Sequence, residues 1–117
     1  MPRPVQLHRR IAWRTFTALA EEAARLRGLT PSQVLHITNK RAPSHARFGL
    51  IWVLRQMDVV YVDIAEQLGM ADHTTILHGM NVATRLREED PVFRMYADDL
   101  LTFAKSIWPE CDAEEAA

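Results

Sequence analysis

The sequence predicts an all-α protein, a compact helical bundle that contains a helix-turn-helix. Apolar residues recur at spacings of three and four along most of the chain, and no segment shows the alternation of a strand. Glycine and proline stand between the periodic segments, where helices end and begin. In the second half of the chain a short break at Gly69 separates two periodic segments, which is the order of elements in a helix-turn-helix.

The chain divides into three parts by composition. We expect residues 1–15 to form a basic N-terminal arm or a helix extension, residues 16–109 the helix-turn-helix domain and residues 110–117 an acidic, disordered tail. The arginines of the first part are open to three interpretations, namely a flexible arm, a phosphate-contacting helix and solubilising charge: Arg3, Arg9, Arg10 and Arg14.

The first two helices are delimited by turn formers. The first helix is expected within residues 5–27 and ends at Gly28. Thr30 is a suitable N-cap with proline directly after it, so a short second helix should run to about His36. Residues 39–45 combine bases with turn formers and a proline, and we expect an exposed basic loop there.

The remaining helices follow from apolar periodicity. Residues 44–57 predict the central core helix, anchored by Trp52, and a short helix should lie between Asp58 and Gly69. Asp72 can cap the next helix, whose buried side we expect to be lined by Ile76, Met80, Ala83 and Leu86. The last helix should run from Pro91 to Pro109, with an apolar stripe of Val92, Tyr96, Leu100, Phe103 and Ile107.

Composition narrows the class of protein. The 117 residues suffice for one domain, and Cys111, the single cysteine, can form neither an intrachain disulfide nor a cysteine zinc site. No run approaches the roughly 18 apolar residues of a membrane span, and no signal peptide is evident. We therefore expect a cytoplasmic protein without metal, cofactor, membrane partner or small-molecule substrate. No arrangement of nucleophile and base supports catalysis.

The charge is unevenly distributed. Residues 1–55 hold ten lysines and arginines against two acidic residues, whereas residues 56–117 hold four against thirteen, and the whole chain has a net charge of -1. A basic half can neutralise phosphates, while an acidic half turned away keeps the protein soluble and offers a second, protein-binding face.

The first turn after the break is unusually polar. Asp72-His73-Thr74-Thr75 precedes the apolar Ile76. Threonine offers a hydroxyl and a methyl group to base edges, and histidine can donate or accept in the major groove. The N–H groups and dipole at the start of this helix also favour a nearby phosphate. The pattern therefore predicts a helix that reads duplex DNA.

These residues also resemble a known family. The string from Asp72 to His78, preceded by Ile64-Ala65-Glu66-Gln67-Leu68-Gly69, resembles the C-terminal DNA-binding domain (domain IV) of the bacterial replication initiator DnaA. The resemblance runs more weakly from about Phe16 to Lys105. It implies a helical fold related to that of the Trp repressor. Because no Gly-rich phosphate loop is present, it implies a stand-alone DNA-binding domain that lacks the ATPase module.

The resemblance assigns roles to individual residues. It implies that His73 and Thr74 reach DNA bases in the major groove, with Asp72 and Thr75 in support. It also implies that a basic side chain of the loop enters the minor groove. The residues with implied DNA contacts outside that turn are Lys40 or Arg41 in the loop, Arg47 at the start of the core helix, and Arg55 at a phosphate. His78 has a structural or phosphate-side role, since its spacing from His73 does not suit a shared metal.

The chain departs from the family at positions that would contact DNA. Ala71 replaces an arginine, Phe48 replaces a glutamine, and Val60-Tyr61-Val62 replaces a Ser-Leu-Pro sequence. We expect sequence-preferring binding at DnaA-box-like sites that regulates replication initiation or transcription, in a nucleoid-associated protein. The alternative is an adaptor that binds replication-initiation proteins through its acidic half, with reduced or no DNA binding.

Overall fold

The computed structural model describes residues 10–36, 40–70 and 73–108, and for His73 only the backbone. These residues form an all-α bundle, as the sequence predicts, and contain no strand. The helices are α1 (Trp13–Arg27), α2 (Pro31–Leu35), α3 (Arg41–Gln56), α4 (Tyr61–Gln67), α5 (His73–Glu89) and α6 (Pro91–Ile107). Residues 1–9 of the predicted arm (1–15) and the predicted tail (110–117) lie outside the described residues, so the proposed division of the chain stays a prediction.

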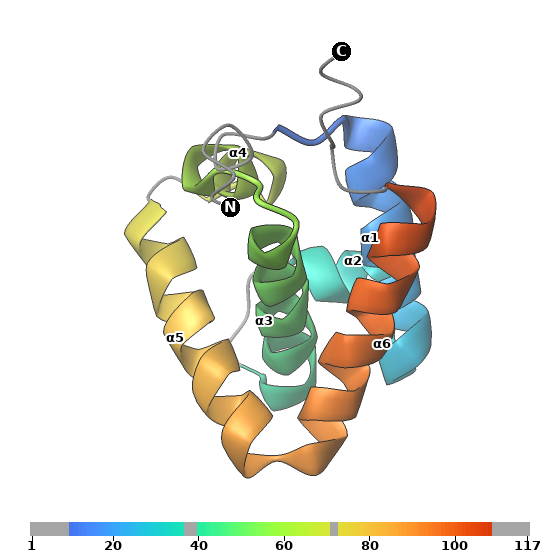
Figure 1. The fold of residues 1–117 in the computed structure, drawn as a ribbon, viewed down its shortest axis with the longest axis vertical. Coiled ribbons are helices and arrows are strands. Elements are labelled where there is room, and N and C mark those ends of the chain that lie inside the picture. The colour runs from blue at the N-terminus through green and yellow to red at the C-terminus, as the bar shows by residue number, and fades with distance from the viewer. Residues whose placement is uncertain (1–9, 37–39, 71–72, 109–117) are drawn as a thin grey trace, which may run out of the picture.

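The bundle is organised around α3 (Figure 1). α5 runs along one side of α3, α1 and α6 lie on the other side, and α4 crosses the end where α3 finishes. Leu50, Ile51 and Leu54 of α3 are almost fully buried, and each such side chain contributes roughly 1.5–3 kcal/mol through its burial. Trp52 is also buried, as predicted, and the guanidinium of Arg87 lies 4.1 Å from the centre of its ring.

The helix ends confirm the predicted signals at Gly28, Thr30 and Gly69, and Asp90 provides a further N-cap that was not predicted. Gly28 and Gly69 have φ values of 69° and 72°, the left-handed conformation that favours glycine after a helix. Thr30 and Gln33 form a reciprocal capping box at the start of α2. At the start of α6, Oδ1 of Asp90 accepts hydrogen bonds from the first backbone N–H groups.

Two expectations about helix position were wrong. α3 begins at Arg41, so the basic loop ends earlier than expected. Pro43 lies in the first turn of α3, where its missing N–H group has no intrahelical acceptor to lose. On α6 the predicted stripe is rotated, because Val92 and Ile107 are exposed and the buried positions are Phe93, Tyr96, Ala97, Leu100 and Ala104.

Among the described helices, none is both long enough and apolar enough to cross a bilayer.

Candidate nucleic-acid interface

The helix-turn-helix consists of α4, a short turn and α5. α4 ends at a turn in which Gly69 adopts the left-handed conformation and the N–H of Met70 donates to the carbonyl of Ala65 at 2.8 Å. Ile64 of α4 and Ile76 of α5 are both fully buried where the two helices pack. The predicted N-cap, Asp72, lies outside the described residues. The backbone of α5 nevertheless begins at His73, the residue directly after it.

The first turns of α5 present polar groups to solvent. Thr74, Thr75 and His78 are exposed, whereas Ile76 on the opposite side is buried. Leu77 is also 40 % exposed, so this face of the helix offers hydroxyls, an imidazole and one apolar side chain. Such a face can enter a groove without unfolding any part of the core. The side chain of His73, the predicted base reader, lies outside the described part.

An aromatic ring replaces the expected glutamine beside this helix. Phe48 of α3 is partly buried, and its ring lies 6.4 Å from the imidazole of His78 in an edge-to-face arrangement. The centre of the His45 imidazole lies 6.3 Å from the centre of the same Phe48 ring. The ring therefore packs between α3 and α5 and supports the position of His78.

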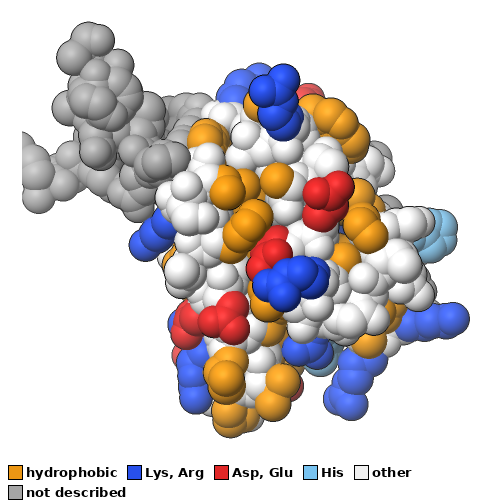
Figure 2. Space-filling model, turned by 90° about the vertical axis from the view of Figure 1, so that its right-hand side faces the viewer, with side chains coloured by type: hydrophobic (Ala, Val, Ile, Leu, Met, Phe, Trp, Pro, Cys, Tyr) orange, Lys and Arg blue, Asp and Glu red, His pale blue; other side chains and the backbone are white. Residues whose placement is uncertain are grey.

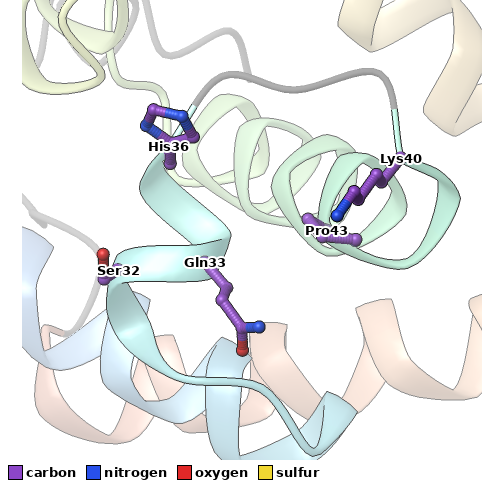
Figure 3. A pocket seen from close by; sticks show the side chains of 5 residues that line it. All are labelled: Ser32, Gln33, His36, Lys40 and Pro43. Atoms are coloured by element: carbon purple, nitrogen blue, oxygen red, sulfur yellow. The ribbon is translucent and has the colours of Figure 1, made fainter.

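The predicted basic loop leaves α2 and enters α3 beside a hollow. His36 and Lys40 stand on the two sides of residues 37–39, and both side chains are exposed. With Ser32, Gln33 and Pro43, these two residues line a hollow of about 330 Å³. Figure 3 shows the five side chains. Arg41, the other predicted loop base, is exposed in the first turn of α3.

Arg47 lies beneath this loop instead of on the surface. Its side chain is almost buried, with 5 % of the residue exposed, and burial lowers the pKa of its guanidinium. Nη1 donates to the carbonyl of His36 at 3.0 Å and, at 3.4 Å, to the carbonyl of Val34. Arg47 therefore holds the end of α2 against α3. A contact with DNA stays a prediction.

Arg55 lies at the corner between α3 and α4. Its Nη1 donates to the carbonyl of Val59 at 2.5 Å, and its guanidinium carbon lies 4.3 Å from the centre of the Tyr61 ring. Both side chains are partly exposed. The corner thus carries a positive charge of defined orientation at the start of the helix-turn-helix.

The segment before α1 contacts α4 in a way that the sequence pattern does not reveal. The N–H of Ile11 donates to Oδ2 of Asp63 at 2.8 Å, and Nε2 of Gln67 donates to the carbonyl of Ile11 at 3.2 Å. Arg10 lies 3.8 Å from Asp63 and 3.6 Å from Glu66. Ile11 and Asp63 are buried. The short apolar run Ile11-Ala12-Trp13 between arginines was the available signal, but the partners of Ile11 are more than fifty positions away.

A second hollow adjoins the start of α3. It has a volume of about 350 Å³ and is lined by Arg27, Arg41, Ala42, His45 and Asp90. Burial and the positive charges of Arg41 and Arg27 lower the pKa of His45, and the carboxylate of Asp90 opposes that shift. The basic character of the loop therefore continues around the first turn of α3.

The side of the bundle where α1 and α6 lie, across α3 from α5, does not form a patch of a single charge. Figure 2 shows this face, on which basic, acidic and hydrophobic side chains are intermingled. Arg87 pairs with Asp98 at 2.6 Å, and Arg25 pairs with Glu22. Each half of the sequence is therefore neutralised in part by an ion pair of its own.

The fold and this surface define a small helical domain with a helix-turn-helix. Over 81 residues the chain is 30 % identical to the chromosomal replication initiator protein DnaA of Caulobacter sp. (strain K31), covering 68 % of this chain and 16 % of that protein. The chain is thus a distant relative of a domain-sized part of DnaA and spans about one sixth of its length. No model of a protein family matches the chain.

Proposed function

We propose that the protein binds double-stranded DNA with a preference for short DnaA-box-like sites and regulates replication initiation or transcription without ATPase activity. One observation carries the proposal: the described first turns of α5 expose Thr74, Thr75 and His78 immediately after the turn of a helix-turn-helix. The relation to a domain-sized part of a replication initiator supports the same reading.

In this proposal α5 enters the major groove. His73 and Thr74 contact base edges, Asp72 and Thr75 support the turn, and His78 lies toward the sugar-phosphate backbone. A bidentate or well-packed contact with a base edge discriminates between bases by about 1–3 kcal/mol. These few side chains are therefore sufficient for a preference among sites.

The basic side chains around the start of α3 supply affinity that does not depend on the DNA sequence. Lys40 or Arg41 approaches the minor groove and neighbouring phosphates, and the buried Arg47 supports them by fixing the loop. Each neutralised phosphate steepens the salt dependence of binding. Occupying a site without hydrolysing ATP allows regulation by competition with, or recruitment of, other proteins.

The test is fluorescence anisotropy with two labelled duplexes, one carrying an initiator box and one with the same bases scrambled, at two salt concentrations. We expect the wild type to prefer the box. His73→Ala and Thr74→Ala should each reduce that preference roughly tenfold, because about 1.4 kcal/mol of discrimination is lost. Thr84→Ala is the matched control, since Thr84 is exposed on the same helix but three turns away from the predicted reading end.

Variants of the loop separate the two kinds of contact. Lys40→Gln and Arg41→Gln should weaken binding to both duplexes by the same factor and reduce the salt dependence. Equal losses on both duplexes from the α5 variants as well would contradict the assigned roles. A wild type that binds neither duplex would overturn the proposal.

A second candidate function is an adaptor for replication-initiation proteins. It is favoured by Val92 and Met95, which lie one helical turn apart on α6 with 63 % and 66 % of each residue exposed. The exposed acidic residues Asp98 and Asp99 follow on the next turn of the same helix. A pull-down from host lysate treated with nuclease separates the two functions. Partners that survive nuclease and are lost in a Val92→Glu, Met95→Glu double variant support the adaptor, and partners that vanish with nuclease support tethering through DNA.

A further inference from the structure

The corner between α3 and α4 pairs an arginine with an aromatic ring. We propose that Tyr61 positions the guanidinium of Arg55 to bind a backbone phosphate of DNA beside the helix-turn-helix. This inference rests on the proposed function, because it requires duplex DNA as the ligand. It goes beyond that function by assigning a positioning role to Tyr61, at one of the positions where the sequence departs from the family it resembles.

The geometry holds the guanidinium at two points. Its carbon lies 4.3 Å from the centre of the Tyr61 ring, which is within the range of a cation–π contact. Nη1 donates to the carbonyl of Val59 at 2.5 Å, within the turn that joins the two helices. The ring contact and the hydrogen bond together restrict a side chain that is otherwise long and flexible.

A restricted guanidinium retains the donors that phosphate recognition needs. Arginine carries five N–H groups in one plane, and only one of its terminal nitrogens donates to Val59. A cation–π contact with the ring uses none of the N–H donors, which point outward along the edge of that plane. Arginine binds phosphate with paired donors along such an edge, and a pre-oriented fork loses less conformational entropy when it does so.

The location suits a phosphate more than a base. Tyr61 is the first residue of α4, the first helix of the motif, and that helix crosses the DNA backbone when the second helix lies in the major groove. Within the described part of the chain, no carboxylate forms an ion pair with Arg55. The positive charge of this corner is therefore available to a negatively charged ligand.

A purely structural role for the pair is the competing explanation. Arg55 lies in the last turn of α3, where a cation also stabilises the helix dipole and where its bond to Val59 closes the corner. Loss of that role lowers stability but leaves the charge contacts between protein and DNA unchanged. The experiment must therefore read out the salt dependence of binding together with the unfolding temperature.

The test compares Tyr61→Leu, Tyr61→Phe, Arg55→Gln and the Tyr61→Leu, Arg55→Gln double variant on the box and scrambled duplexes across a series of salt concentrations. We expect Arg55→Gln to weaken binding to both duplexes roughly tenfold and to reduce the slope of log K against log salt by about 0.9. Tyr61→Leu should produce part of both changes, about two- to fivefold in affinity. Tyr61→Phe should resemble the wild type, because phenylalanine keeps the ring.

The double variant decides between positioning and an independent contact. If Tyr61 acts through Arg55, adding Tyr61→Leu to Arg55→Gln should cause no further loss of affinity. A Tyr61→Leu protein that unfolds at a lower temperature but keeps the wild-type salt slope would overturn the inference. That result is distinguishable from failure of the proposed function, in which the wild type itself binds neither duplex.

Discussion

Gly49 of α3 lies directly against the ring of Tyr96 of α6. A β-carbon added at Gly49 would overlap Cε2 of that ring, and the ring cannot withdraw easily because its hydroxyl donates to the carbonyl of Ala46 at 2.6 Å. Both residues are buried. Glycine at this position therefore sets the distance at which α6 packs on the central helix.

Gly49→Ala should consequently destabilise the protein in spite of the higher helix propensity of alanine. We expect the free energy of unfolding to fall by about 1–3 kcal/mol through overpacking. Urea denaturation followed by circular dichroism measures this change.

Gly79→Ala is the matched control for that variant. A β-carbon at Gly79 would lie 2.9 Å from Cδ1 of Ile51, which is the far end of a flexible side chain, and the gain of about 1 kcal/mol in helix propensity offsets the contact. We expect a change near zero. Equal destabilisation by the two variants would contradict the view that the Tyr96 ring is the fixed element.

The order of the helices could be predicted because its signals are local. Thr30 followed by proline and glutamine determines the start of α2, and Gly28 and Gly69 end their helices in the one conformation that glycine adopts at little cost. The buried face of α6 could not be assigned by spacing alone. Phe93 and Val92 are neighbours of similar character, and only the positions of α1 and α3 determine that Phe93 is buried while Val92 is exposed.

In the candidate site, too, some features could be predicted from local sequence signals and others depend on distant contacts. Exposure of Thr75 and His78 follows from the period of α5, in which Ile76 faces the core. The burial of Arg47 could not be predicted, because its acceptors lie on α2 and a cation at the start of a helix ordinarily faces solvent. The contact between Ile11 and Asp63 joins positions 52 residues apart, and no local pattern encodes such a pair.

The buried carboxylate of Asp63 is expected to stabilise the attachment of the N-terminal segment to α4. Asp63→Ala leaves the buried N–H of Ile11 without its acceptor, and we expect the free energy of unfolding to fall by about 1–3 kcal/mol. Asp63→Asn keeps an acceptor oxygen and should lose less. Chemical denaturation measures both changes.

Glu66→Ala is the control for these variants, because Glu66 interacts with the same Arg10 but is largely exposed. We expect an effect within about 0.5 kcal/mol. An Asp63→Ala protein as stable as the wild type would show that the hydrogen bond to Ile11 contributes nothing to the fold.

Stability should depend on pH through His45. Burial, followed by the charges of Arg41 and Arg27, lowers the pKa of His45 in the folded protein, so the unfolded chain binds this proton more tightly. The stabilisation is present above the unfolded pKa of about 6.5 and is lost as the pH falls below it. The unfolding temperature should therefore decrease between pH 7.5 and pH 5.5.

His45→Gln removes this titration and should flatten the profile, whereas His36→Gln, at an exposed site on the rim of the other hollow, should leave it unchanged. Differential scanning fluorimetry in buffers of equal ionic strength measures the three profiles. A wild-type profile that His45→Gln does not alter would assign the pH dependence to other groups.

Arg47 is expected to act on DNA binding through the loop that it holds. Arg47→Met removes the donor to the carbonyls of Val34 and His36 while keeping an apolar stem, and we expect a loss of about 1–3 kcal/mol in the free energy of unfolding. Affinity should fall on the box and on the scrambled duplex alike, because Lys40 and Arg41 lose their fixed positions.

The comparison with Lys40→Gln separates this support from a direct phosphate contact. Lys40 is exposed, so its variant should change the salt slope of binding without changing stability. Arg47→Lys retains the charge but not the planar fork, and we expect it to lose stability as Arg47→Met does. If Arg47→Lys instead restores both stability and affinity, then one charged donor to these carbonyls is sufficient and the planar fork of Arg47 is not required.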